Sequence, residues 1–211
     1  MKYVLIIGND RFQKYIAYEL LKKCRPECLI IENFNSIFTN KFEKIKSAYL
    51  YGNIFNVLNK FYNEYKLKKF FKKYNYEFQN LFSNNINFNF DNLLHTSSVN
   101  NLDILQQLEK YNFDIIICIG TSIIKSDILK IYENKIFNLH TSILPKYRGV
   151  LAEFWALYYA DYNNIGVSLH KIKRELDSGD IVAQKKINYN KKDTPAVLRF
   201  KNANASIDLI I

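Results

Sequence analysis

The chain has 211 residues, of which 48% are hydrophobic and 16% aromatic, and it carries a formal net charge of +10. This length and this apolar content are sufficient for one substantial folded domain and argue against a disordered chain. The positive charge favours anionic partners such as nucleotides, phosphates or nucleic acid. Lysines distributed over a solvated surface are the simpler explanation of the same charge.

The cysteine pattern argues against a disulfide framework and against a zinc site. The chain has 3 cysteines, an odd number, and the pair Cys24 and Cys28 has neither a second pair nor a nearby histidine. Cys118 lies inside an apolar run and is expected in the core. We therefore expect no bound metal.

The sequence shows neither a targeting signal nor a membrane-spanning segment. The apolar start of the chain turns polar at Asn9, which is too early for a signal peptide, and no apolar run approaches the length of a membrane span. These patterns predict a cytoplasmic protein without membrane contact.

The first third of the chain begins with a βαβ unit. The run "YVLIIG" at 3–8 is continuously apolar and ends in glycine, which is typical of a buried parallel strand. A helix is predicted next, with Asn9 or Asp10 as its N-cap, and "ECLIIEN" at 27–33 predicts a second strand. The unit favours an α/β fold, a mostly parallel Rossmann-like sheet flanked by helices.

The stretch from about 35 to 100 carries less decisive patterns. "SAYLYGN" at 47–53 allows a strand. Residues 54–78 alternate apolar and basic side chains at helical spacing, which favours an amphipathic helix with solvated lysines over a nucleic-acid patch. His95, in "LLHTSS", is interpreted as part of a polar loop and receives no role.

The middle of the chain returns to alternating helices and strands. The predicted elements are a helix at 101–111, a strand at 113–120, a helix at 126–132 and a strand at 135–140. Ser126 or Asp127 is the expected cap of the second helix. The last strand places Asn138 and His140 at its carboxyl end, where ligands bind in open α/β sheets.

The C-terminal part predicts a helix at 151–161, an antiparallel hairpin of strands at 165–173 and 180–189, and a final helix from Thr194. "LDSG" between the two strands supplies the turn residues of the hairpin. Thr194 is the expected cap of the final helix, with Pro195 in its first turn. His170 is interpreted as structural, and Trp155 as either a core residue or a wall of a substrate pocket.

Three polar residues form the candidate catalytic set. Asn138 and His140 lie two positions apart on a strand, so their side chains point to the same side. An amide can donate to an oxygen that gains negative charge, and a histidine can take a proton near neutral pH. Asp177, in the predicted turn, can orient the histidine or a water. A structural histidine beside a capping asparagine would give the same spacing.

The glycine after the first strand is a candidate for phosphate binding. "IIGND" has a single glycine and is not a dinucleotide fingerprint. Gly8 and Asn9 nevertheless stand at the start of a helix, where backbone N–H groups can bind a phosphate.

Two separated segments, "FNLHTSILPKYRG" at 137–149 and "GVSLHKIKRELDSGDIVAQ" at 166–184, resemble the folate-dependent formyltransferase family. Its members include glycinamide ribonucleotide, methionyl-tRNA and sugar-nucleotide formyltransferases. The resemblance extends from about 113 to 198, and it implies the formyltransferase fold in one catalytic domain, residues 1–211.

The resemblance also implies a co-substrate, 10-formyltetrahydrofolate, and a set of site residues. Asn138, His140 and Asp177 match the catalytic residues of the family. Backbone groups of two segments would hold the pterin edge, and these are Ser122, Ile123, Ile124 and Lys125 in one and Glu175, Leu176 and Asp177 in the other.

The implied reaction is attack of a free acceptor amine on the formyl carbon. Asn138 and His140 stabilise the resulting oxyanion, or His140 accepts the proton of the amine, while Asp177 holds the imidazole or a relay water. Tyr147 and Arg148, in the loop that follows, can reach the acceptor. Neither a metal nor a nucleophilic side chain is required.

Three acceptors compete within the resemblance. Methionyl-tRNA enzymes usually carry a further C-terminal domain that this sequence lacks, and glycinamide ribonucleotide enzymes usually have Gly-Ser-Asn where this chain has "GND" at 8–10. "HTSILPKYRG" at 140–149 fits the sugar-nucleotide enzymes better, which predicts a UDP- or dTDP-linked 4-amino-4,6-dideoxyhexose as acceptor.

Other classes stay open beside this preferred prediction. They are the two other acceptors, hydrolysis of the formyl-folate, and a non-catalytic folate- or nucleotide-binding module. Motifs for RNA stacking are not evident, so nucleic acid is not an expected partner. A homodimer is possible.

Overall fold

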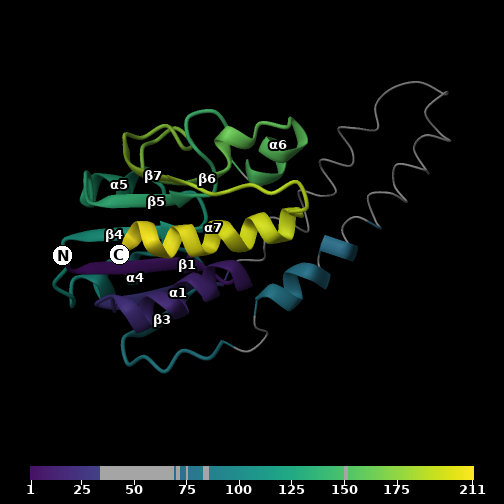
Figure 1. Cartoon of the computed structure of the whole chain (residues 1–211). Helices are drawn as coiled ribbons and strands as arrows, with labels where there is room; N and C mark the ends of the chain where they lie inside the picture. The colour runs from purple at the N-terminus through teal and green to yellow at the C-terminus, as the bar shows by residue number, and fades with distance from the viewer. Residues whose placement is uncertain (34–68, 70–71, 75, 83–85, 150–151) are drawn as a thin grey trace, which may run out of the picture.

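The computed structural model describes residues 1–33, 69, 72–74, 76–82, 86–149 and 152–211 (Figure 1). Within these ranges, seven strands form one sheet in the order β3-β2-β1-β4-β5-β6-β7. The strands are β1 (Tyr3–Gly8), β2 (Cys28–Glu32), β3 (Leu93–Thr96), β4 (Ile115–Ile119), β5 (Ile136–His140), β6 (Gly166–Lys171) and β7 (Ile181–Lys186). The predicted α/β class is confirmed.

The sheet changes from parallel to antiparallel pairing at β5. β1 pairs in parallel with β2 and β4, β2 pairs in parallel with β3, and β4 pairs in parallel with β5. β6 is antiparallel to β5, and β7 is antiparallel to β6, which confirms the predicted hairpin. The chain first builds outward from β1 to β3 and then returns to the other side of β1, which makes the carboxyl ends of β1 and β4 a topological switch point.

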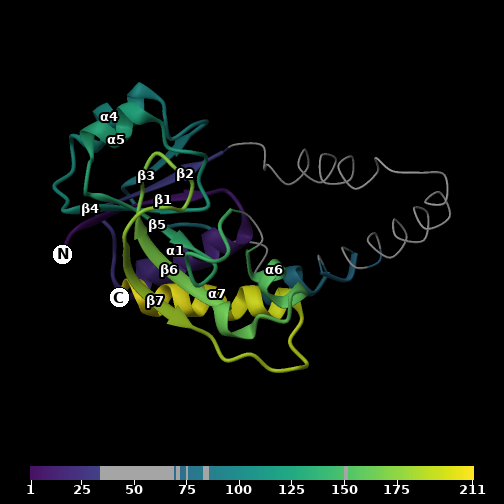
Figure 2. The same cartoon turned by 90° about the horizontal axis from the view of Figure 1, so that it is seen from above.

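Helices cover both faces of the sheet. Figure 2 shows α1 and α7 on one face and α4 and α5 on the other. The helices are α1 (Arg11–Lys23), α4 (Leu102–Leu108), α5 (Ser126–Ile131), α6 (Ala152–Tyr158) and α7 (Pro195–Ile210), with a short 3-10 helix at Tyr162–Asn164. None of the helices in the described ranges is long and apolar enough to cross a membrane.

The alternation of side chains on β1 explains the three layers. Leu5 and Ile7 pack in the core cluster under α1 and α7, whereas Val4 and Ile6 pack in the cluster under α4 and α5. Every residue of β1 is buried, because both faces of a parallel strand need apolar cover. The prediction of buried strands at 3–8 and 113–120 rests on this rule, and it is confirmed.

The helix starts agree with the sequence at two of three positions. The Asp10 carboxylate accepts the Arg11 N–H, and the Thr194 hydroxyl accepts the Val197 N–H, with a proline in the first turn of α7. The prediction of Ser126 or Asp127 as the cap of α5 is wrong. Lys125 stands at the cap position without a side-chain hydrogen bond, and its N–H donates instead to Asn100 Oδ1.

The prediction of a polar loop around His95 is also wrong. His95 lies in β3, where it pairs with Ile31 of β2. This strand is short, lies at the edge of the sheet and is stabilised by the backbone of β2, which is a long-range contact that local polarity does not show. The possible strand at 47–53 and most of the predicted helix at 54–78 lie outside the described residues.

Candidate active site

Asn138 and His140 lie on β5, the strand that pairs in parallel with β4 on one side and antiparallel with β6 on the other. On one side Asn138 pairs with Cys118 of β4, and on the other side it pairs with His170 of β6. Leu139, between them, packs into the core under α1 and α7. The two polar side chains therefore lie on the opposite face of the sheet.

Asp177 is the centre of the cluster. Its Oδ1 accepts the Asn138 Nδ2–H at 3.3 Å and lies 3.5 Å from His170 Nε2. Its Oδ2 accepts the Gly149 N–H at 2.8 Å and lies 3.5 Å from His140 Nδ1. The loop after β6 thus folds back over β5 and brings together the three residues that the sequence predicted as catalytic.

The hydrogen bonds of His140 define its protonation sites. Nε2 lies 2.7 Å from the carbonyl oxygen of Tyr147, which can only accept, so Nε2 carries a hydrogen. The Ser142 hydroxyl donates to the same carbonyl at 2.7 Å and fixes its position. Nδ1 faces Asp177 Oδ2 at 3.5 Å and carries the lone pair of the neutral ring.

His170 is the site residue that the sequence interpretation missed. Its Nδ1 lies 2.8 Å from the Lys171 carbonyl and therefore carries a hydrogen, which leaves Nε2 free to accept from Asn138 Nδ2 at 3.2 Å. Asn138 then has a partner for each amide hydrogen, since the second one donates to Asp177. A usable signal was present, because His170 and Ser168 alternate in "GVSLHK" as Asn138 and His140 do in β5.

Asp177 is held as a carboxylate in a strained turn. Burial alone would raise its pKa, but the neighbouring imidazoles of His170 and His140 and the Gly149 N–H together lower the pKa below the usual value. Its φ of 47° lies in the left-handed region, which is uncommon for a residue other than glycine and clusters at functional sites. A negative charge is thereby fixed beside two imidazoles.

The loop after β5 turns backbone groups toward the cluster. Tyr147 presents its carbonyl to His140, while its hydroxyl donates to Asp161 Oδ2 at 3.0 Å. Gly149 has a φ of 83°, which requires glycine, and its N–H reaches Asp177. The side chain of Arg148 is exposed. The loop therefore contributes main-chain atoms to the cluster.

Trp155 is neither a core residue nor a described neighbour of the cluster. Its side chain on α6 is 37% exposed and makes edge contacts with the rings of Phe154 and Tyr158. It also stacks on Tyr159. Tyr158 and Tyr159 are each 64% exposed, so this group of rings lies at the protein surface.

The first predicted folate segment, residues 122–125, is hydrogen-bonded to the side chains of Glu32 and Asn100. Ser122 donates its N–H and its hydroxyl to the fully buried carboxylate of Glu32 at 2.7 and 2.6 Å. The Asn100 amide donates to the Ile123 carbonyl and accepts the Lys125 N–H. The Ser122 N–H is thus already in use, and the Ile123 side chain, 73% exposed, is presented to solvent.

The second predicted folate segment belongs to the turn that carries Asp177. Leu176 is 58% exposed, and the Glu175 carbonyl accepts the Ser178 hydroxyl. The two segments adjoin β4 and β6, the strands that pair with β5 on either side. Each presents one exposed apolar side chain beside backbone groups.

Gly8 and Asn9 lie at the carboxyl end of β1, before α1. The Asp10 carboxylate already accepts the Arg11 N–H at 2.9 Å. An anion at this helix start would have to compete with that carboxylate for backbone N–H groups.

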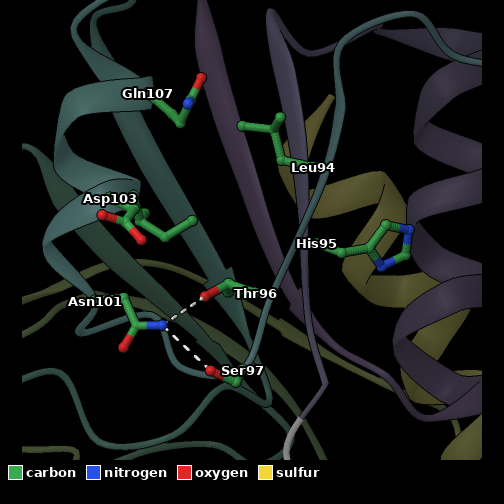
Figure 3. Close-up of a pocket in the computed structure, with 8 residues that line it drawn as sticks. Leu94, His95, Thr96, Ser97, Asn101, Asp103 and Gln107 are labelled. Carbon is green, nitrogen blue, oxygen red and sulfur yellow. Dashed lines mark hydrogen bonds between the residues drawn. The ribbon is translucent and has the colours of Figure 1, made fainter.

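A separate hollow of about 290 Å³ lies between β3 and α4 (Figure 3). Asn101 donates into it toward the hydroxyls of Thr96 and Ser97. β3 is the edge strand at the far end of the sheet from β6 and β7, and no predicted site residue lines the hollow. Its lining residues are Leu94, His95, Thr96, Ser97, Asn101, Asp103, Ile104 and Gln107.

Comparisons with known proteins point in one direction. A family model described as formyl transferase matches residues 64–210. The bifunctional polymyxin resistance protein ArnA of Wigglesworthia glossinidia brevipalpis is 36% identical over 119 residues, which cover 56% of this chain and 18% of that protein. A methionyl-tRNA formyltransferase of Finegoldia magna is 38% identical over 91 residues, which cover 43% of this chain and 29% of that protein. The matches therefore span less than a third of these two relatives.

Solved structures give the same fold. The phosphoribosylglycinamide formyltransferase of Bacillus halodurans superposes with a TM-score of 0.60 at 18% sequence identity. The superposition covers 99% of this chain and 91% of that one.

Proposed function

The chain belongs to the formyl transferase family, and we propose that it transfers the formyl group of 10-formyltetrahydrofolate to the amine of a nucleotide-linked amino sugar. The observation that carries the proposal is the single carboxylate of Asp177, which contacts Asn138 and also faces the His140 imidazole. An amide donor and a proton acceptor held by one charge are the groups that amine formylation needs.

His140 is the proposed base. The Tyr147 carbonyl keeps the hydrogen of the neutral ring on Nε2, so the lone pair is on Nδ1. The acceptor nitrogen forms its bond to the formyl carbon and gives a proton to Nδ1. The imidazolium that results is stabilised by Asp177, 3.5 Å away. The bond from the formyl carbon to the folate nitrogen then breaks, and that nitrogen takes the proton.

Asn138 is the proposed donor to the formyl oxygen. Its contact to Asp177 measures 3.3 Å, which is long compared with the roughly 2.7–2.9 Å of strong charge-assisted bonds. The hydrogen of this weak contact is the one that a formyl oxygen placed beside it can accept as negative charge develops, while the bond to His170 keeps the amide in place. A donor oriented before the reaction needs no reorganisation during it.

The two segments at 122–125 and 175–177 are the proposed folate site. The exposed side chains of Ile123 and Leu176 suit the faces of a flat heterocycle, and backbone groups beside them suit its polar edge. Because Glu32 already accepts the Ser122 N–H, the contacts to folate must come from the other backbone groups of the segment.

The preferred acceptor is a UDP- or dTDP-linked 4-amino-4,6-dideoxyhexose, bound by one catalytic domain formed by residues 1–211. Support comes from "HTSILPKYRG" at 140–149 and from exposed Arg148, which can pair with a diphosphate. The other proposed substrate-binding residues are Tyr147 in the same loop, Trp155 on the surface of α6, and Gly8 and Asn9 at the carboxyl end of β1. Glycinamide ribonucleotide and methionyl-tRNA are the alternatives, because similar proteins carry these names.

An acceptor panel tests the proposal. The protein is incubated with 10-formyltetrahydrofolate and, in separate reactions, UDP- and dTDP-linked amino sugars, glycinamide ribonucleotide and methionyl-tRNA. Mass spectrometry should show one added formyl group on an amino sugar. Formylation of methionyl-tRNA alone, or release of formate without any acceptor, would contradict the sugar assignment.

The role of His140 has its own test. His140→Ala should lower turnover about 100-fold or more, because a positioned acid–base group has roughly that effect. Calorimetry with a folate analogue should show nearly unchanged binding. His95→Ala is the matched control, since His95 lies on β3 at the far side of the sheet, and its turnover should stay at the wild-type level. Wild-type turnover in His140→Ala would remove His140 from the mechanism.

A further inference from the structure

A buried ion pair lies close to the proposed base. Glu153 on α6 and Arg199 on α7 meet with Oε1 and Nη1 2.6 Å apart, and their side chains are 3% and 8% exposed. The other carboxylate oxygen of Glu153 accepts the Thr141 hydroxyl at 2.9 Å. Thr141 is the residue directly after His140, so the pair contacts the end of β5.

Arg199 is anchored in the core. Its guanidinium lies 4.4 Å from the ring centre of Phe12 on α1, in a cation–π arrangement. Burial acts to lower the pKa of Arg199, but the nearby carboxylate of Glu153 outweighs it, and the net direction is upward. Arg199 is therefore always charged, and it holds Glu153 at a fixed point under the sheet.

The Thr141 hydroxyl connects this fixed point to the candidate active site. Residues 142–149 follow it, and they carry the Tyr147 carbonyl that bonds His140 and the Gly149 N–H that bonds Asp177. The Ser142 hydroxyl supports the Tyr147 carbonyl. Movement at Thr141 would therefore shift an acceptor that decides which nitrogen of His140 carries the hydrogen.

We propose that Glu153 is a positioning residue for His140. By accepting the Thr141 hydroxyl while Arg199 holds it, Glu153 fixes the end of β5 and keeps the Tyr147 carbonyl on His140 Nε2. The ring is thereby kept in one tautomer, with Nδ1 as the reactive nitrogen. The kinetic part of the inference rests on the proposed function, but the tautomer part does not.

Thr141→Val is the decisive variant. It replaces the hydroxyl by a methyl group of the same shape and leaves the ion pair of Glu153 and Arg199 in place. Thr141→Ser restores the hydroxyl and should restore wild-type behaviour. Thr96→Val is the matched control, because the Thr96 hydroxyl also ends a strand and donates to a neighbour, the Ser98 carbonyl, but far from β5.

The first readout is nitrogen NMR of the histidine rings, which is simple because the chain has 3 histidines. Wild-type His140 should give one tautomer with the hydrogen on Nε2. In Thr141→Val its signals should shift to the average of both tautomers, whereas Thr141→Ser and Thr96→Val should keep the wild-type pattern.

The second readout is kinetic. Turnover of Thr141→Val should fall about tenfold, which corresponds to one lost hydrogen bond to a charged group, with the KM for 10-formyltetrahydrofolate unchanged. A single Nε2–H tautomer with wild-type turnover in Thr141→Val would overturn the inference, as would an equal defect in Thr141→Ser. Should Thr141→Val not fold, Thr141→Ala is read in the same way.

Failure of the two proposals can be told apart. If the wild-type protein formylates no acceptor of the panel, the proposed function fails, while the histidine spectra still decide whether Glu153 positions His140. If formylation occurs and the spectra of Thr141→Val match the wild type, only the positioning role fails.

Discussion

Two buried carboxylates near the end of β5 behave as opposites. Glu153, on α6, faces Arg199, a cation that does not lose its proton, and its other oxygen accepts the Thr141 hydroxyl. Asp177, over β5 and β6, faces two imidazoles, an amide and a backbone N–H. The region around Glu153 can therefore only hold its neighbours in place. The region around Asp177 contains groups whose protonation can change, and this is the property that chemistry requires.

A third buried carboxylate completes the comparison. Glu32 accepts from the Val99 N–H and from two groups of Ser122, all of them neutral donors. It connects the end of β2 to the segment after β4 without a described cation. Burial of a carboxylate therefore does not by itself mark an active site, and the partners decide its role.

The largest effect on stability is expected when the cation of the buried Glu153–Arg199 pair is removed. Arg199→Ala leaves Glu153 buried without its cation, and we expect the free energy of unfolding to fall by about 3–5 kcal/mol, measured by urea denaturation. Lys185→Ala is the control, because Lys185 pairs with Asp208 on the surface, where both side chains are about half exposed, and little change is expected. Equal effects of the two variants would contradict the structural role of the buried pair.

The second largest effect is expected on turnover, when the charge of Asp177 is removed. Asp177→Asn keeps the size of the side chain, and asparagine tolerates the left-handed backbone at this position. The neutral amide cannot stabilise an imidazolium at His140, so turnover should fall about 100-fold or more. The free energy of unfolding should fall less than it does in Arg199→Ala. Steady-state kinetics and urea denaturation of the same preparation measure both. Unchanged turnover would place Asp177 with Glu153 as a structural carboxylate.

The same variant gives a pH test with a defined sign. The pKa of Asp177 is lower in the folded protein than the value of about 3.9 in an unfolded chain. The unfolded state then binds more protons as the pH falls, so the stabilisation by the carboxylate is complete above pH about 5 and is lost at more acidic pH. The stability difference between wild type and Asp177→Asn should shrink on acidification. A difference that grows would mean that the pKa of Asp177 is raised.

The smallest effect is expected at Cys118, which neighbours Asn138 in the sheet but has no part in the cluster. Burial, with a contribution from the charge of Glu32, raises the pKa of Cys118 to about 12, and burial raises that of Cys28 to about 11. Iodoacetamide at neutral pH should therefore label half-buried Cys24 alone in the folded protein, as counted by mass spectrometry. Labelling of Cys118 before unfolding would show that this part of the sheet opens.

Much of the fold could be predicted because its signals are local. Continuous apolar runs marked β1 and β4, and the residues Asp10 and Thr194 marked the starts of α1 and α7. The edge strand β3 and the start of α5 were missed. β3 depends on pairing with β2, and the start of α5 is fixed by Asn100, so neither has a signature within its own segment.

The sequence by itself determined the class of fold, the strand that carries Asn138 and His140, and the family resemblance, because side-chain alternation and helix capping act between residues a few positions apart. The tertiary structure decided which groups surround Asp177. Gly149 and Asn138 reach it from 28 and 39 positions away, and His170 meets Asn138 only through the antiparallel register of β5 and β6. The link from Arg199 through Glu153 to Thr141 is likewise a contact between helices and a strand end. Such contacts depend on how the layers pack, and local patterns in the sequence do not encode that packing.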